Sequence, residues 1–125
     1  MDSCIFCSIV QGKIPAEKVF ENENFLAFLD IRPQSAGHTL VIPKQHYRWV
    51  WDVPQAGEYF EIVKKIALAQ KKAFDIELVQ GKVYGEEIPH AHFWVFPDPA
   101  STKDDKNDLT TNAQKIREIF KKGEI

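Results

Sequence analysis

The segment HAHFW, residues 90–94, constrains the fold of this chain more than any other stretch. If these residues form a β-strand, alternate side chains point to opposite faces of a sheet. One set is apolar and suits a core beneath the sheet: Ala91, Phe93 and Val95. The other set shares the opposite face: His90, His92 and Trp94. We therefore expect two imidazoles roughly 7 Å apart on an open face, an arrangement that favours a functional site over a structural histidine.

The other two histidines are also close together. His38 and His46 bound the segment HTLVIPKQH. All 4 histidines therefore lie in two segments rather than along the whole chain.

Both cysteines lie in one motif near the N-terminus, Cys4-x-x-Cys7. One close pair cannot form a disulfide framework, which indicates a reducing compartment and predicts a cytoplasmic protein. A redox motif needs a preceding strand, and too few residues precede Cys4 for one. Three readings stay open: a zinc site completed by two further ligands, a pair of small apolar residues packed beside Ile5 and Phe6, and, least favoured, redox chemistry.

Hydrophobic periodicity and turn residues predict an α+β domain over residues 1–125. A five-stranded antiparallel sheet would pair with one long helix and short N- and C-terminal helices, because the connections are too short for parallel crossovers. The expected helices are 3–11, 56–74 and 110–122, and the expected strands are 18–21, 25–31, 38–43, 76–80 and 91–97. Residues 97–109 are expected to form a flexible loop. Trp49 and Trp51 are expected to pack beneath the long helix, with a substrate mouth or a dimer contact as alternatives.

Composition excludes several classes of protein. The chain has 125 residues and a formal net charge of −2, which argues against tight binding of a nucleic-acid backbone. No apolar run approaches the length of a membrane span, and the N-terminus lacks the basic start of a secretory signal. We therefore expect neither a nucleic-acid partner nor a membrane partner.

Five blocks of the sequence, in order, resemble the histidine triad (HIT) family. They are residues 4–15 (CIFCSIVQGKIP), 19–23 (VFENE), 27–33 (AFLDIRP), 37–46 (GHTLVIPKQH) and 90–94 (HAHFW). The resemblance spans nearly the whole chain. It implies a HIT-like fold and a small nucleotide-binding hydrolase or transferase that is a homodimer. The implied substrates are purine nucleotide conjugates such as nucleoside phosphoramidates and dinucleoside polyphosphates.

The resemblance also implies a function for individual residues. His92 matches the middle histidine, the nucleophile that attacks the α-phosphorus and forms a covalent nucleotidyl-imidazole. His38 matches a histidine beside that site, and Asp30 matches the carboxylate that accepts hydrogen bonds from the ribose hydroxyls. The residues matching the apolar slot around the base are Ile5, Phe6, Ile9, Ile14, Phe28, Ile31 and Leu40.

The resemblance implies a structural zinc as well. Family members with an N-terminal Cys-x-x-Cys bind zinc through both cysteines and two histidines. The matching ligands here are Cys4, Cys7, His46 and His90. Such a set of four protein ligands is closed, so its metal is structural rather than catalytic.

The chain departs from the family pattern at the phosphate site. Trp94 replaces the third histidine of the triad, and indole offers one N–H donor but no titratable proton. Val79 stands where an asparagine is usual in the nucleotide pocket, and Glu86 and Glu87 stand where Gln and a small hydroxyl residue approach the phosphate. These changes predict an altered or weakened activity. The alternatives are a catalytically silent nucleotide-binding protein with a structural zinc, and a zinc-stabilised dimer that serves only as an interaction module.

Overall fold

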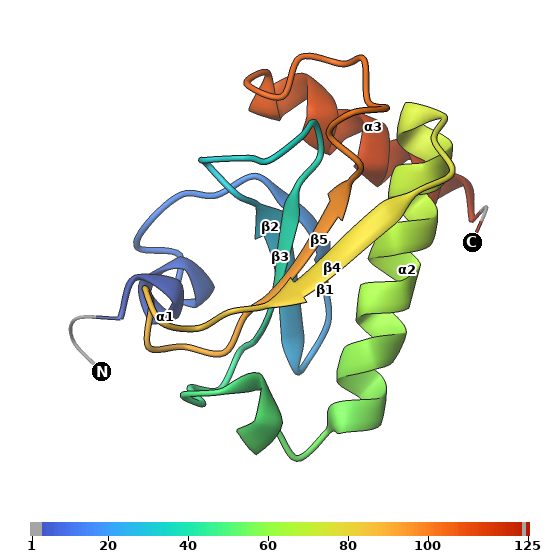
Figure 1. The fold of residues 1–125 in the computed structure, drawn as a ribbon. Coiled ribbons are helices and arrows are strands. Elements are labelled where there is room, and N and C mark those ends of the chain that lie inside the picture. The colour runs from blue at the N-terminus through green and yellow to red at the C-terminus, as the bar shows by residue number, and fades with distance from the viewer. Residues whose placement is uncertain (1–3, 124) are drawn as a thin grey trace.

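The computed structural model describes residues 4–123 and 125, and these form one antiparallel sheet with helices on both faces (Figure 1). The strands lie in the order β1-β2-β3-β5-β4. The elements are α1 (Ile5–Val10), β1 (Lys18–Glu21), β2 (Phe25–Leu29), β3 (Thr39–Pro43), a 3-10 turn (Val50–Asp52), α2 (Ala56–Phe74), β4 (Val79–Val83), β5 (Phe93–Pro97) and α3 (Leu109–Lys122). The predicted α+β class with a five-stranded antiparallel sheet is confirmed.

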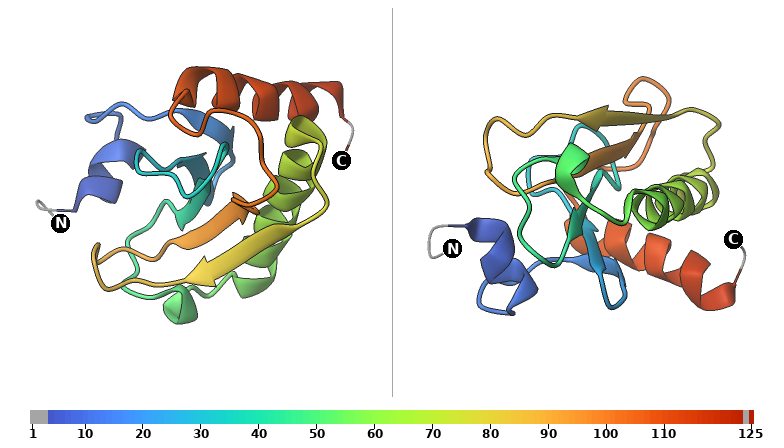
Figure 2. Two further views of the ribbon diagram at one scale, coloured as in Figure 1. Left: turned by 45° about the horizontal axis from the view of Figure 1, so that its top comes forward. Right: turned by 90° about the horizontal axis from the view of Figure 1, so that it is seen from below.

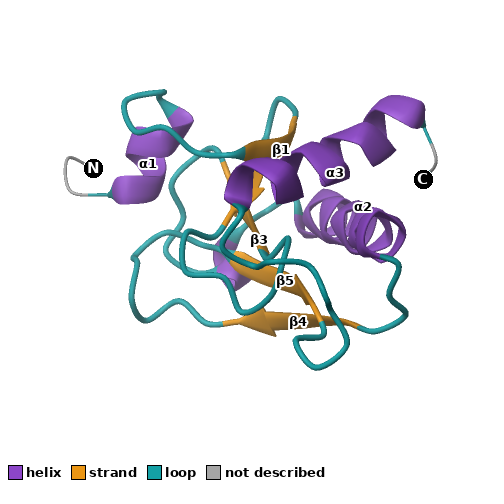
Figure 3. Ribbon diagram, turned by 90° about the horizontal axis from the view of Figure 1, so that it is seen from above, coloured by secondary structure: helices purple, strands orange, loops and turns teal. Residues whose placement is uncertain are grey.

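The two faces of the sheet are covered by different helices. Helices α2 and α3 pack together over one face, and α1 lies apart from them (Figures 2 and 3). Every residue of β2 and β3 is buried, and alternation divides them between two cores. Phe25, Ala27 and Leu29 join the core under α2 and α3, whereas Leu26 and Phe28 join a smaller core under α1. Both strands need a nearly continuous run of apolar residues, because each is buried on both faces of the sheet.

The sequence predicted an open face for His90 and His92, and this prediction is wrong, because both side chains are buried. Strand β5 begins at Phe93, so His90 lies in a bend and Ala91 and His92 lie between that bend and the strand. His90 and His92 are nevertheless buried, because α1 lies over them and the Phe6 ring meets both imidazoles edge-on at 5.8 and 5.3 Å. The alternation itself is correct, since Ala91 and Val95 are buried in the core on the α2 side.

Strand β4 lies three residues later than the predicted strand at 76–80. Helix α2 is capped by Asp75 in the left-handed conformation, and the Ile76 N–H still donates a hydrogen bond to the Lys71 carbonyl. Residues 75 and 76 therefore belong to the end of the helix, and the strand begins only at Val79. Gly81 lies just beyond the predicted strand 76–80 but inside the observed strand β4. A Cβ added there would lie 3.0 Å from Phe93 Cε1, so glycine allows β4 to pack closely against β5.

The connection between β5 and α3 contains no regular element but is hydrogen-bonded. The Ser101 and Thr102 N–H groups donate to the Asp98 carbonyl at 3.1 Å, and the Asn112 side chain donates to the Asp105 carbonyl at 2.8 Å. Helix α3 begins one residue before the predicted 110–122 because Asp108 caps it through the Thr111 N–H. Helix α1, by contrast, is shorter than the predicted helix 3–11, and residue 3 lies outside the described residues.

Trp51 does not pack beneath α2, where the sequence placed it. Its side chain is 77 % exposed, and Trp49 stacks under the Arg48 guanidinium at 3.7 Å. Within residues 4–123, no helix is both long and apolar enough to cross a membrane.

Candidate functional site

A cavity of about 400 Å³ lies between α1 and the sheet. All seven apolar residues predicted for the base slot line it: Ile5, Phe6, Ile9, Ile14, Phe28, Ile31 and Leu40. Asp30, Arg32 and Glu87 supply charge at the same cavity. An apolar cleft with a few polar groups at its edge suits a flat, mostly apolar ligand group with polar substituents.

Asp30 follows the end of β2 and is held there by its backbone. Its N–H donates to the His38 carbonyl at 2.9 Å, and its Oδ1 accepts a hydrogen bond from the Arg32 N–H at 2.9 Å. Burial raises the pKa of the Asp30 carboxyl, and the charge of Glu87 raises it further, while the Arg32 hydrogen bond and nearby His92 act in the opposite direction. Asp30, Glu87 and His92 therefore share one electrostatic environment.

His38 is fully buried just before β3. Its Nδ1 accepts a hydrogen bond from the Gln34 N–H at 3.0 Å, so the ring proton is on Nε2. That Nε2 lies 3.8 Å from Asp30 Oδ2, too far for a hydrogen bond, and it has no partner among the described residues. Burial lowers the pKa of His38 to about 4, so the imidazole is neutral at pH 7.

We expect this histidine to destabilise the protein in acid. Because the pKa of His38 falls from 6.5 to about 4 on folding, the unfolded chain binds its proton first as the pH drops. The free energy of unfolding should therefore decrease by about 3 kcal/mol between pH ~6.5 and ~4. Urea titrations across this range would measure it, and His38→Asn, which keeps an acceptor for Gln34, should remove that part of the slope. An identical pH dependence in both proteins would contradict the assignment.

His92 is held in one tautomer. Its Nδ1 lies 2.8 Å from the His90 carbonyl oxygen, which can only accept, so Nδ1 carries the proton and donates it. The lone pair is then on Nε2. The ring also packs edge-on against Phe6, a residue that lines the cavity, at 5.3 Å between centroids. An imidazole with a fixed ring and an unprotonated Nε2 can act as a nucleophile or as a base.

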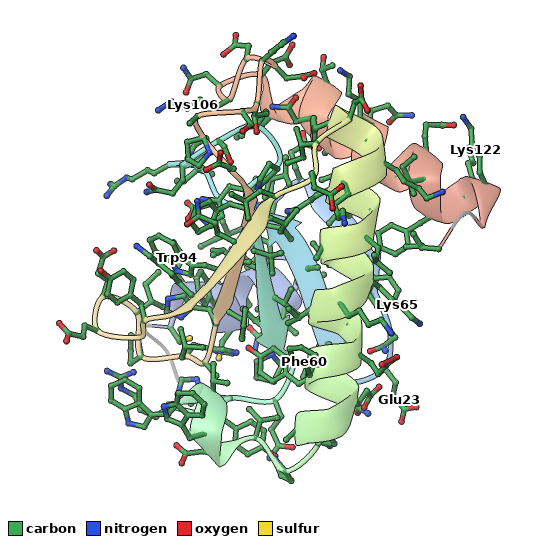
Figure 4. All side chains as sticks on the ribbon, turned by 45° about the vertical axis from the view of Figure 1, so that its right-hand side comes forward. Glu23, Phe60, Lys65, Trp94, Lys106 and Lys122 are labelled. Carbon is green, nitrogen blue, oxygen red and sulfur yellow. The ribbon has the colours of Figure 1, made fainter. Side chains whose placement is uncertain are left out.

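Trp94 lies between His38 and Tyr84, on the side of the sheet away from α2 (Figure 4). Its ring centroid is 5.0 Å from that of His38 and 5.3 Å from that of Tyr84. The indole Nε1 is shielded from solvent and has no hydrogen-bond partner within the described part of the chain. Trp94 also lines a second cavity of about 250 Å³ with Tyr84, Glu86 and Glu87. The structure thus brings both predicted glutamates to Trp94.

Val79 does not belong to this site, contrary to the sequence prediction. It lies opposite Pro97 at the start of β4 and packs against the core on the α2 side. The next residues that face the Trp94 side of the sheet are at even-numbered positions of β4, such as Lys82, whose Nζ lies above the Trp94 ring. Strand alternation therefore turns the Val79 side chain away from the cavity.

The four predicted metal ligands come together from three parts of the chain. Cys4 caps α1 and Cys7 lies in its first turn, His46 follows β3, and His90 precedes β5. Their ligand atoms all lie within 4.8 Å of one another. His90 Nδ1 is 3.2 Å from Cys4 Sγ and 3.5 Å from Cys7 Sγ, and His46 Nδ1 is 3.3 Å from Cys7 Sγ. The group can hold a metal ion.

These distances and the surrounding hydrogen bonds fit a tetrahedral metal. Tetrahedral zinc with its usual bond lengths separates sulfur and nitrogen ligands by roughly 3.5 Å. The His90 Nε2–H donates to the Pro43 carbonyl at 2.8 Å, which leaves Nδ1 unprotonated and directed at the sulfurs. Burial raises the pKa of the Cys7 thiol to about 11, so a metal must displace its proton on binding.

The HIT domain family model matches residues 11–100 of the chain. The chain belongs to the HIT, or histidine triad, family. It is 43 % identical to a HIT-like protein of Methanocaldococcus jannaschii over 100 residues, which cover 75 % of this chain and 78 % of that protein. It is 36 % identical over 110 residues to the adenosine 5′-monophosphoramidase of Saccharomyces cerevisiae, with 86 % of this chain and 67 % of that enzyme covered.

Solved HIT proteins share the fold. A zinc-bound histidine triad family protein from Mycobacterium smegmatis superposes with a TM-score of 0.84 and 29 % identity, covering 98 % of this chain and 96 % of that one. The three helices and five strands described above are thus a HIT fold.

Several residues at the HIT site were not foreseen from the sequence. Ile88 and Arg32 line the larger cavity, and Tyr84 lines the smaller one. Ile88 and Tyr84 lie on the segment between β4 and β5, whose path depends on tertiary packing rather than on a periodic pattern. Arg32 had a local signal, since it lies two residues after Asp30 and its N–H fixes that carboxylate.

Proposed function

We propose that the protein is a nucleotide hydrolase or nucleotidyl transferase that acts at the α-phosphate of purine nucleotide conjugates through a covalent nucleotidyl-His92. One observation carries the proposal: the His90 carbonyl holds the proton of His92 on Nδ1, which leaves the Nε2 lone pair free on a ring that packs against Phe6, a residue of the cavity that contains Asp30. The name of the yeast relative, an adenosine 5′-monophosphoramidase, supports phosphoramidates as the substrate class.

The nucleoside would bind in the larger cavity. Its base would lie against the apolar residues of α1 and the sheet, where burial of a purine is favourable. The ribose hydroxyls would donate hydrogen bonds to Asp30, whose Oδ2 accepts none from the described residues. In this pose the α-phosphate would lie on the histidine side of the cavity.

The reaction would proceed by two displacements. His92 Nε2 attacks phosphorus, the bond from phosphorus to nitrogen breaks, and the nitrogen keeps the electron pair of that bond and takes a proton from solvent, so that it leaves as an amine. Water then attacks the phosphoryl-imidazole, its oxygen bonds to phosphorus, and His92 Nε2 regains its lone pair. The net reaction consumes one water, whose hydroxyl ends on the nucleoside monophosphate and whose proton ends on the amine.

Two neutral donors would stabilise the charge on phosphorus-bound oxygens. The His38 Nε2–H and the Trp94 Nε1–H are both buried and unpartnered within residues 4–123, and their rings are neighbours. Phosphoryl oxygen would supply the acceptor that each lacks. Trp94 cannot give a proton to the leaving group, so substrates that need such help would react slowly.

We also propose that Cys4, Cys7, His46 and His90 hold a structural zinc. The bound ion would supply no reaction chemistry and would cross-link α1 to the segment that follows β3 and to the segment that precedes β5. His90 would then have two tasks, since its ring binds the metal while its carbonyl orients His92. The zinc-bound relative from M. smegmatis supports the choice of metal.

A silent nucleotide-binding protein is the second candidate, favoured by Trp94 at the third triad position and by the two glutamates beside it. Incubation of the protein with adenosine phosphoramidate, followed by chromatography of the products, separates the two. A hydrolase releases AMP at a rate that scales with protein concentration. A silent protein binds AMP in a calorimeter but leaves the phosphoramidate intact.

Nucleotide affinity should depend on Asp30 in either case. We expect Asp30→Asn to raise the Kd for AMP about 10- to 100-fold, because hydrogen bonds from hydroxyls to a half-buried carboxylate are lost. Isothermal titration calorimetry measures this directly. Asp75→Asn, at the C-cap of α2, removes the same charge far from the cavity and should leave the Kd unchanged. Equal Kd values for all three proteins would refute the ribose assignment.

We propose a homodimer in the cytoplasm as the working form. An exposed apolar groove of about 280 Å³ on the other side of the molecule supports self-association, and Phe60 on α2, 63 % exposed, is part of it (Figure 4). Its lining residues are Val50, Trp51, Ala56, Tyr59, Phe60, Val63 and Phe93. The thiols of Cys4 and Cys7, which form no disulfide, suit a reducing compartment, and the net charge of −2 argues against a nucleic-acid partner.

A further inference from the structure

The smaller cavity beside Trp94 has a chemical character that the proposed hydrolysis does not itself require. Two aromatic rings, Tyr84 and Trp94, meet edge to face at 5.3 Å, and two carboxylates, Glu86 and Glu87, complete the lining. Tyr84 and both glutamates are exposed to solvent. Aromatic faces combined with carboxylates are the groups that recognise an organic cation.

The carboxylates of this cavity have no cationic partner of their own. Neither Glu86 nor Glu87 forms an ion pair within residues 4–123. Their negative charge repels an anion that enters the cavity, such as the remainder of a polyphosphate chain. The same charge attracts an ammonium group.

The aromatic rings already attract a cation within the molecule. The Lys82 ammonium lies 5.4 Å from the Tyr84 ring centroid and 6.0 Å from the Trp94 ring centroid. Both distances are within the range of a cation–π contact. Lys82 is exposed and its side chain is flexible, so a ligand ammonium can take its place.

The smaller cavity adjoins the proposed site of reaction. Glu87 lines both cavities, and the buried Trp94 Nε1–H lacks an acceptor among the described residues. A phosphoryl oxygen at that N–H places the scissile bond at Trp94. The leaving group must then extend over the indole toward Tyr84, Glu86 and Glu87.

We propose that the leaving group carries a positive charge, and that Tyr84, Trp94, Glu86 and Glu87 form the subsite that selects it. The substrate class is a nucleoside phosphoramidate whose amine bears a second, protonated amino group. This inference rests on the proposed function and specifies its substrate. The third triad position has thus changed from a proton-transferring histidine to one wall of a cation subsite.

The test compares three adenosine phosphoramidates of matched chain length, whose amine ends in an ammonium, a methyl or a carboxylate group. The wild-type kcat/KM should be about tenfold higher for the ammonium substrate than for the methyl one, and lowest for the carboxylate one. In E86Q/E87Q the preference should fall to about twofold or less. The matched charge change E23Q/E61Q, at exposed positions outside both cavities, should leave it intact. In Lys82→Met the preference should rise, because a competing ammonium is removed.

Binding separates failure of this inference from failure of the proposed function. Kd values for the same three compounds are measured on His92→Ala, which cannot turn them over. Equal kcat/KM and equal Kd across the series would overturn the cation subsite and leave the hydrolase intact. No turnover of any compound, with an ammonium preference retained in Kd, would overturn the hydrolase and support the subsite.

Discussion

Replacement of His92 by alanine is expected to lower kcat/KM for an adenosine phosphoramidate by about a thousandfold or more. The imidazole is the nucleophile of the first displacement, and removal of an enzyme's nucleophile costs this much or more. A continuous assay of amine release from wild type and variant gives the ratio. The fold should survive, because the His92 ring forms a single hydrogen bond, to the His90 carbonyl.

Binding of AMP to the variant serves as the control for that experiment. A Kd within a few-fold of wild type shows that the cavity is intact, so that the lost rate is chemical. If the variant binds AMP normally and its kcat/KM is within tenfold of wild type, His92 is not the nucleophile. If it neither binds AMP nor melts cooperatively, His92→Asn, which retains a side-chain donor for the His90 carbonyl, replaces it in the comparison.

Loss of the metal is expected to have the largest effect on stability. Cys4→Ser should abolish zinc binding and lower the free energy of unfolding by at least about 3 kcal/mol, or roughly 10 °C in Tm, because the ion binds the folded state and not the unfolded chain. Elemental mass spectrometry of the purified protein and thermal melts measure the two quantities.

A chelator provides the matched control for the metal prediction. Wild-type protein stripped of zinc should melt where Cys4→Ser melts, and the chelator should not shift Cys4→Ser further. Added zinc should restore the wild type alone. A purified wild-type protein that contains no metal and keeps its full Tm would rule out the structural zinc.

The parts of the fold that were predictable from sequence are those with local causes. Helix α2 was predicted at residues 56–74 because its apolar residues repeat at helical spacing, and it begins and ends there. Strand β1 was likewise predicted at its observed residues. Strand β4 was displaced because its start depends on how α2 ends at Asp75, and because Gly81 marks a close approach to Phe93 rather than a turn.

Most of the residues that line the two cavities were named from the sequence, but their environment was not. Alternation along residues 90–95 correctly put His92 and Trp94 on one face, yet nothing local indicated that α1 covers that face. Val79 was misplaced for the converse reason, since a family position was carried over without the register of β4 against β5. The tautomers of His38 and His92 depend on the Gln34 N–H and the His90 carbonyl, which only the folded chain brings into place.

The most direct test of the central claim is the stereochemistry at phosphorus. A phosphoramidate made chiral by sulfur substitution, hydrolysed in isotopically labelled water, reports how many displacements occur. Attack by His92 followed by attack of water inverts phosphorus twice, so the account predicts net retention of configuration. Net inversion would mean that water attacks the substrate directly, and would contradict the covalent nucleotidyl-His92.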